Sequence, residues 1–324
     1  MATIDPCKLL CASESAYCIS TSANNGRYNP CDMNFDVTDN MRKQYNSVNF
    51  IGDPFVIVAS PIPKYDKYIK IEACLVGETA EGIIISFRGT LPPVPVTVDS
   101  IADWIENIFY VDTKPYIIGK PGEVHEGFLD AFMLLKDGII NALNVLNPNY
   151  TKPIYITGHS KGGAVAPIAA MYFKEMNIFQ ATEVLTFAGP KPGNGEFRDV
   201  FNLAFPHYTN YENYLDIVPF LPPGKVFIDL IANIPFLPDV IKKLLHEAAN
   251  LDYEPVGSNN VQFVNKHGIV DNSFPESNPL LRFGKILEEL TKGKPGAEQI
   301  ANAHHITCGF RYIKGVCKGT ICPK

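Results

Sequence analysis

Short apolar runs and longer amphipathic stretches alternate along the chain. The short runs are rich in Ile, Val, Tyr and Phe and are bounded by Gly, Pro or Asn, as β-strands commonly are. They predict seven strands, over residues 55–60, 68–76, 82–87, 153–157, 183–187, 207–212 and 260–266. Runs such as 83–87 are apolar almost throughout, which indicates strands that are buried on both faces of a sheet.

Amphipathic helices are predicted between these strands. From residue 128 onward, apolar positions recur at i, i+3, i+4 and i+7, and the same helical face then continues. This face consists of Phe128, Ala131, Phe132, Leu135, Ile139, Leu143 and Leu146. Two more helices are predicted over residues 160–176 and 280–291. Strands that alternate with helices indicate an α/β fold, with a mostly parallel central sheet flanked by helices.

Composition narrows the class of protein. The 324 residues are 46% hydrophobic, and no linker or repeat divides them, so we expect a single domain over residues 1–324 with insertions. The formal net charge of −6 and the scattered lysines give no support to nucleic-acid binding. The most apolar stretch, 226–241, is interrupted by Asp and Pro, so no transmembrane segment is predicted.

The cysteines gather near the two ends of the chain. Seven of the eight lie in residues 7–31 and 308–322, and only Cys74 lies between. This distribution favours disulfides and a secreted mature form, although the first residues lack the features of a signal peptide. An intracellular location stays open as the alternative. A zinc site is the competing interpretation of the cysteines, but no Cys-x-x-Cys pair occurs.

One segment carries a candidate nucleophile. Residues 154–163 read Ile-Tyr-Ile-Thr-Gly-His-Ser-Lys-Gly-Gly, in which a strand runs directly into Gly-x-Ser-x-Gly. Gly158 and Gly162 let strand and helix approach closely while Ser160 is exposed on a strained turn. A serine in this setting is suited to acyl transfer.

A serine hydroxyl needs a base and an acid that orients the base. In α/β-hydrolases the acid and then the histidine follow the serine along the chain. Asp216 directly follows a predicted strand and fits the acid, although an ordinary turn aspartate would look the same. The candidates for the base are His207, His267, His304 and His305.

The oxyanion of the transition state also needs donors. The backbone N–H of Lys161, which follows the serine, is one candidate. Thr90, at the exit of the strand over residues 82–87, is the other, because it offers both an N–H and a hydroxyl.

Six motifs in the same order carry a family resemblance. They are Phe-Arg-Gly-Thr at 87–90, Asp-Trp at 103–104, Val-His-Glu-Gly-Phe at 124–128, Gly-His-Ser-Lys-Gly at 158–162, Thr-Phe-Ala-Gly-Pro-Lys-Pro-Gly-Asn at 186–194 and Asp-Ile-Val-Pro at 216–219. Together they resemble the fungal-type, or class 3, lipases, a family of the α/β-hydrolase superfamily. The similarity extends from about residue 16 to the C-terminus.

The resemblance assigns roles to individual residues. It implies Ser160 as the nucleophile, Asp216 as the orienting acid, and Thr90 with Lys161 as the oxyanion hole. For the base it leaves His304 and His305, and His304 is slightly favoured. It also implies a disulfide between Cys18 and Cys317, and it implies neither a metal nor an organic cofactor.

Two regions are expected to cover the site. Within residues 91–110, one helical face carries Ile101, Trp104, Ile105 and Ile108, and the family has its lid here. A fixed surface helix is the alternative. Residues 225–250 form an apolar helical insertion, which serves either ordinary packing or the acyl pocket. Lys161 is a departure from the family's apolar residue, and its ammonium is expected to alter the pocket rim or the pKa of the base.

The resulting hypothesis is a serine carboxylic ester hydrolase, with a triacylglycerol lipase favoured. Its partner would be a lipid or ester substrate at an interface, and its oligomeric state is left open. The alternatives are an esterase or phospholipase, a feruloyl esterase, and an inactive lipid-binding protein.

Overall fold

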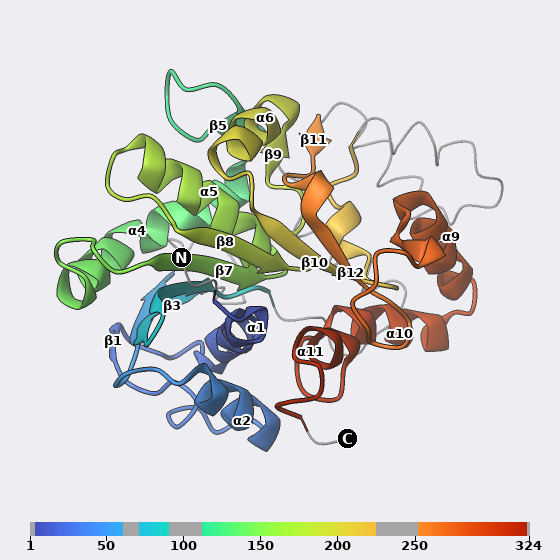
Figure 1. The fold of residues 1–324 in the computed structure, drawn as a ribbon, viewed down its shortest axis with the longest axis horizontal. Helices are drawn as coiled ribbons and strands as arrows, with labels where there is room; N and C mark the ends of the chain where they lie inside the picture. Colours follow the sequence, from blue (N-terminus) through green and yellow to red (C-terminus); the bar gives the residue numbers. More distant parts are fainter. Residues whose placement is uncertain (1–3, 61–70, 91–111, 225–251, 323–324) are drawn as a thin grey trace.

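A mixed β-sheet of eight strands organises the chain in the computed structural model, which describes residues 4–60, 71–90, 112–224 and 252–322 (Figure 1). The strand order is β1-β2-β3-β4-β7-β8-β10-β12; the strands from β4 to β12 are parallel and the others antiparallel. Their bounds are β1 Gly26–Arg27, β2 Phe55–Ala59, β3 Glu72–Thr79, β4 Gly82–Phe87, β7 Ile154–His159, β8 Glu183–Phe187, β10 Thr209–Asn213 and β12 Val261–Val264.

A second, smaller sheet has the order β11-β9-β6-β5 and is antiparallel. Its strands are β5 Thr113–Pro115, β6 Glu123–His125, β9 Gly193–Asn194 and β11 Tyr253–Glu254. The described α-helices are α1 Pro6–Ser15, α2 Asp39–Val48, α4 Glu126–Leu146, α5 Lys161–Glu175, α6 Gly195–Ala204, α9 Pro279–Leu290, α10 Lys294–His304 and α11 Arg311–Val316. Short 3₁₀ turns lie at η1 Ala16–Cys18, η2 Val218–Phe220, η3 Ser258–Asn260 and η4 Pro275–Ser277.

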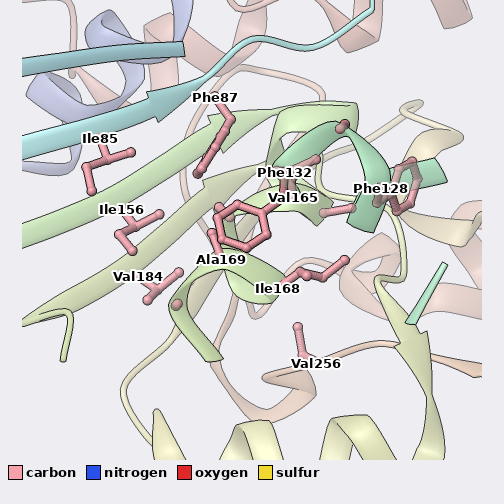
Figure 2. Close-up of a cluster of buried hydrophobic side chains, with 14 of the residues drawn as sticks. Ile85, Phe87, Phe128, Phe132, Ile156, Val165, Ile168, Ala169, Val184 and Val256 are labelled. Carbon is pink, nitrogen blue, oxygen red and sulfur yellow. The ribbon is translucent and has the colours of Figure 1, made fainter. Parts of the chain in front are cut away.

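Helices cover both faces of the main sheet, with α4 and α5 on one side and α1 on the other (Figure 1). Figure 2 shows part of the core under α4 and α5, a buried cluster that includes Phe132 and Val165 of the helices and Ile85 and Ile156 of the strands. On the opposite face, Leu9 and Leu10 of α1 belong to a buried cluster with residues of β4, β7 and α11. Alternate residues of the apolar strands therefore serve two separate cores, which is why these strands lack a polar face.

The predicted α/β architecture is confirmed. Each of the seven predicted strands corresponds to a strand of the main sheet, although the described part of the second begins at Glu72. The predicted helices are α4, α5 and α9. The sequence did not predict the small sheet, whose strands have only two or three residues. Nor did it predict α10, which begins at Lys294.

The expected pairing of Cys18 with Cys317 is wrong. Cys317 bonds to Cys7, Cys18 bonds to Cys31, and Cys308 bonds to Cys322, while Cys11 and Cys74 are buried thiols. Helix geometry explains the difference, because α1 advances about 1.5 Å per residue and carries Cys18 far from the end where Cys7 contacts α11. The zinc alternative has one structural counterpart, a sulfur cluster of Cys7, Cys11 and Cys317, two of which form the disulfide.

The predicted lid, about residues 91–110, and the apolar insertion, about 225–250, lie outside the described residues. Ile101, Trp104, Ile105 and Ile108 are among them, so both assignments stay predictions. Among the described helices, none combines the length and apolarity that a membrane span requires.

Candidate active site

The turn between β7 and α5 has the geometry that the sequence predicts. Ser160 directly follows β7 and is the N-cap of α5, with φ of 57° and ψ of −132°. A Cβ at Gly158 would collide with the Gly162 carbonyl oxygen, and a Cβ at Gly162 would collide with that of Phe87. Only glycine therefore permits this approach of strand and helix, and the strained serine is held at the start of the helix.

Asp216 and His304 are in contact, although they belong to different elements. Asp216 lies three residues after β10, and His304 is the last residue of α10. The Nδ1 atom of His304 lies 3.0 Å from both carboxylate oxygens of Asp216, and both residues are buried. A carboxylate accepts only, so Nδ1 of His304 is the donor in this contact.

Tyr312 of α11 fixes the carboxylate of Asp216. Its hydroxyl donates to Oδ2 at 2.7 Å and accepts the backbone N–H of Asn213 at 2.9 Å. The N–H of Val218 donates to Oδ1 at 3.0 Å. Burial raises the pKa of Tyr312 well above its ordinary value, and the adjacent Asp216 raises it further, so the phenol stays a donor. The carboxylate is thus oriented by donors on two elements.

His159 links the serine turn to His304. Its Nε2 lies 2.7 Å from the carbonyl oxygen of His304, and its Nδ1 lies 2.8 Å from the hydroxyl of Tyr17. Because a carbonyl only accepts, Nε2 is protonated and Nδ1 accepts from Tyr17. Burial lowers the pKa of His159 well below its ordinary value, and the neighbouring His304 lowers it further, so the ring is neutral. The two imidazole centroids are 4.4 Å apart.

The residue that precedes Thr90 lies beside the serine. A Cβ built on Gly89, the preceding residue, would be 3.0 Å from the Cβ of Ser160. Thr90 also lines a cavity of about 160 Å³ together with His159 and His304. The chain after β4 therefore runs along the site, as the predicted oxyanion role requires.

The other residues that the sequence suggested for the site make different contacts. His305 stacks on Phe310 with centroids 4.8 Å apart, and burial lowers its pKa to about 4. Lys161 begins α5, so its N–H belongs to the helix terminus, but its ammonium forms an ion pair with Glu72 at 2.6 Å. Of the other two histidine candidates, His207 precedes β10 and His267 is exposed after β12.

Three positioning residues were missed by the sequence analysis. Tyr312 and His159 contact the site as described, and the side-chain amide of Asn213 donates to the Ala303 carbonyl at 2.6 Å. Tyr17 lies near the start of the family resemblance, which extends from about residue 16 to the C-terminus. For Tyr312 and Asn213 the sequence offers no local signal.

Comparison with solved structures identifies the fold. M37 lipase has a TM-score of 0.56 at 21% identity, covering 82% of this chain and 86% of its own. A mutant form of MDLA from Penicillium cyclopium has a TM-score of 0.54 at 18% identity, covering 84% and 85%. The fold is that of an α/β-hydrolase.

Sequence comparison finds similarity to one family. Residues 84–226 match the model described as lipase (class 3). Lipase A of Sodiomyces alcalophilus is 29% identical, over 45% of this chain and 40% of its own, and the lipase of Rhizomucor miehei is 32% identical, over 46% and 39%. Secreted mono- and diacylglycerol lipase A of Penicillium cyclopium is 30% identical, over 45% of each. The match thus spans less than half of the length of these relatives, and residues 84–226 resemble the class 3 lipases.

Proposed function

We propose that the chain is a serine carboxylic ester hydrolase that acts on acylglycerols. The observation that carries the proposal is the contact of His304 with Asp216, joined through His159 to the turn that bears Ser160. The relatives include lipases, four of them named for mono- and diacylglycerols, and these names favour acylglycerols as substrates.

In the proposed reaction His304 is the base. Its Nε2 takes the proton of Ser160 as Oγ attacks the ester carbonyl, and Asp216 stabilises the imidazolium that forms. The imidazolium then gives this proton to the departing alcohol, which leaves an acyl-enzyme on Ser160. Water loses a proton to His304 and attacks the acyl carbon. The bond from that carbon to Oγ of Ser160 then breaks, His304 returns the proton to Oγ, and the carboxylic acid leaves.

The oxyanion is bound by Lys161 and Thr90. The backbone N–H of Lys161 lies in the first turn of α5, where helical N–H groups have no partner within the helix. Thr90 adds its N–H or hydroxyl from the segment beside Ser160. The Lys161 ammonium forms an ion pair with Glu72, so the side chain takes no part in binding the oxyanion.

The decisive test is the Ser160→Ala variant. Its kcat on a short p-nitrophenyl ester should fall by about 10⁶ if the three residues act as a unit. Ser22→Ala changes an exposed serine and should keep wild-type activity. Hydrolysis near the wild-type rate by Ser160→Ala would refute the proposal.

Two further measurements separate the alternatives. Labelling of Ser160 by a fluorophosphonate is expected, and a folded chain that resists the probe would point to an inactive lipid-binding protein.

A rise in the rate of hydrolysis as a triglyceride passes its solubility limit is expected of a lipase. A rate that saturates below that limit would favour an esterase.

We also propose that residues 1–324 form one domain. The support is that α1 and α11, from the two ends of the chain, pack against the same sheet and against each other. A single urea transition with the same midpoint by fluorescence and circular dichroism is expected. Two separated transitions would contradict it.

A further inference from the structure

A second cavity lies between the turn after β12 and helix α11. Its volume is about 930 Å³, within the range of about 300–1,000 Å³ that is common for small-molecule sites. It shares no lining residue with the small cavity beside His304. Most of its wall comes from residues 309–319, a segment closed by the disulfide between Cys308 and Cys322.

The wall of this cavity is largely apolar. Ile313 is buried in it, Val270 is half-buried, and Ile269 is 57% exposed at the surface. A Cβ added at Gly309 or Gly319 would meet no atom within 4 Å, so both glycines border open space. A hydrocarbon chain therefore has both room and an apolar surface here.

Basic side chains surround the apolar wall. Lys314 and Lys318 line the cavity, and an adjoining cavity of about 360 Å³ adds Lys266, His267 and Arg311. Residues 299–322 contain no Asp or Glu, although the whole chain has a net charge of −6. The fold thus brings together basic residues from two separate segments, 266–267 and 311–318.

These cations contrast with most lysines elsewhere. Lys8, Lys152 and Lys161 each form an ion pair with a glutamate at 2.6–2.7 Å. Among the residues that the structure describes, no such ion pair involves the four Lys and Arg side chains of this group. The nearest acid along the chain, Asp271, instead accepts the hydroxyl of Ser273 at 2.6 Å. Within the described ranges, the cluster is therefore a positive region whose Lys and Arg side chains have no acidic ion-pair partner.

We propose that this cavity binds one long-chain fatty acid. The alkyl chain lies against Ile269, Val270 and Ile313, and the carboxylate lies between the ammonium groups of Lys314 and Lys318. Apolar wall and cations together select an anionic amphiphile over a small hydrophilic anion or a neutral lipid. The choice of a carboxylate head group rests on the proposed function, since ester hydrolysis releases fatty acids.

The test is calorimetric titration of monomeric palmitate into the full-length, oxidised Ser160→Ala chain. Ile269→Asp and Lys314→Glu, each made in that background, should weaken binding at least about tenfold. Leu203→Asp alters an 86% exposed leucine on α6, and Lys43→Glu reverses an exposed lysine of α2. These matched controls should bind palmitate as the parent does. Hexadecanol should bind at least about tenfold more weakly than palmitate.

Equal palmitate binding by the cavity variants and their controls would overturn the proposal. So would binding only to vesicles of anionic phospholipid, because it would indicate a surface for membranes in place of a site for one chain. Binding does not use Ser160, so palmitate binding by a chain whose wild type hydrolyses no ester would refute the proposed function alone.

Discussion

At the scale of single residues, Tyr312 tests how the carboxylate is held. Tyr312→Phe removes the donor to Asp216 and the acceptor of the buried Asn213 N–H. A hydrogen bond to a charged group contributes about 1.5–3 kcal/mol, so kcat should fall about 10–100-fold. The exposed hydroxyl of Tyr28 donates to a carbonyl far from the site, and Tyr28→Phe should change kcat little. Equal kcat values for the two variants would show that Tyr312 does not orient the acid.

Glu14 predicts a pH-dependent stability. Burial raises its pKa from 4.5 to about 7, against the lowering effect of the hydrogen bond from Thr307. The folded chain therefore holds this proton more tightly than the unfolded chain. The stabilisation is complete below pH 4.5 and is lost as the pH rises to about 7, a change on the order of 3 kcal/mol.

Urea unfolding of Glu14→Gln measures this effect, because the amide keeps the shape but does not titrate. Relative to wild type, the variant should gain about 3 kcal/mol in the free energy of unfolding between pH 4.5 and pH 8. Glu298→Gln, at a half-exposed position, should run parallel to wild type. A constant difference between Glu14→Gln and wild type would disprove a buried, protonated Glu14.

How much of the site could be predicted also depends on single residues. The spacing Gly-x-Ser-x-Gly predicts a turn at Ser160, and the structure has that turn. The choice between His304 and His305 depended on tertiary structure, since α10 ends between them and His305 turns to an extended backbone with φ of −74° and ψ of 139°. Tyr312 reaches Asp216 only because α11 packs there, which no local pattern reveals.

At the scale of elements, two glycines give a matched comparison. A Cβ at Gly162 of α5 would collide with the Phe87 carbonyl of β4, and backbone cannot move aside as a side chain can. Gly162→Ala should therefore lower the free energy of unfolding by about 3 kcal/mol, the upper end of common overpacking costs. A Cβ at Gly284 of α9 would meet no atom within 4 Å, and Gly284→Ala should stabilise by about 0.5–1 kcal/mol. Similar changes in the free energy of urea unfolding for the two variants would contradict this account of the turn between β7 and α5.

The elements of the main sheet could be predicted because burial on both faces makes each strand a continuous apolar run, as in Gly82–Phe87. The small sheet could not be predicted in this way. Strands such as Glu123–His125 and Gly193–Asn194 are too short to show a period, and their pairing depends on loops brought together by the fold. The helix over Lys294–His304 could not be predicted either. Its segment is largely polar, and the helix packs through a few residues, among them Ala297 and Ile300.

At the scale of the whole molecule, one disulfide joins the two ends of the chain. Cys7 of α1 and Cys317 after α11 are 310 residues apart, whereas Cys18 and Cys31 are 13 apart. Cross-linking distant residues restricts the unfolded chain more than closing a short loop does. The link lies in the core on one face of the sheet, where α1 and α11 pack together.

We therefore expect unequal losses of stability when these two disulfides are removed one at a time. The Cys7→Ala, Cys317→Ala double variant should lose about 5 kcal/mol in the free energy of unfolding, and Cys18→Ala with Cys31→Ala about 3 kcal/mol. Both members of a pair are replaced because Cys11 lies within 4.8 Å of the sulfurs of Cys7 and Cys317 and could bond to a lone thiol. Urea unfolding of the oxidised proteins gives both values. An equal or larger loss for the short loop would mean that native contacts, and not the restriction of the unfolded chain, set the contribution of the long-range link.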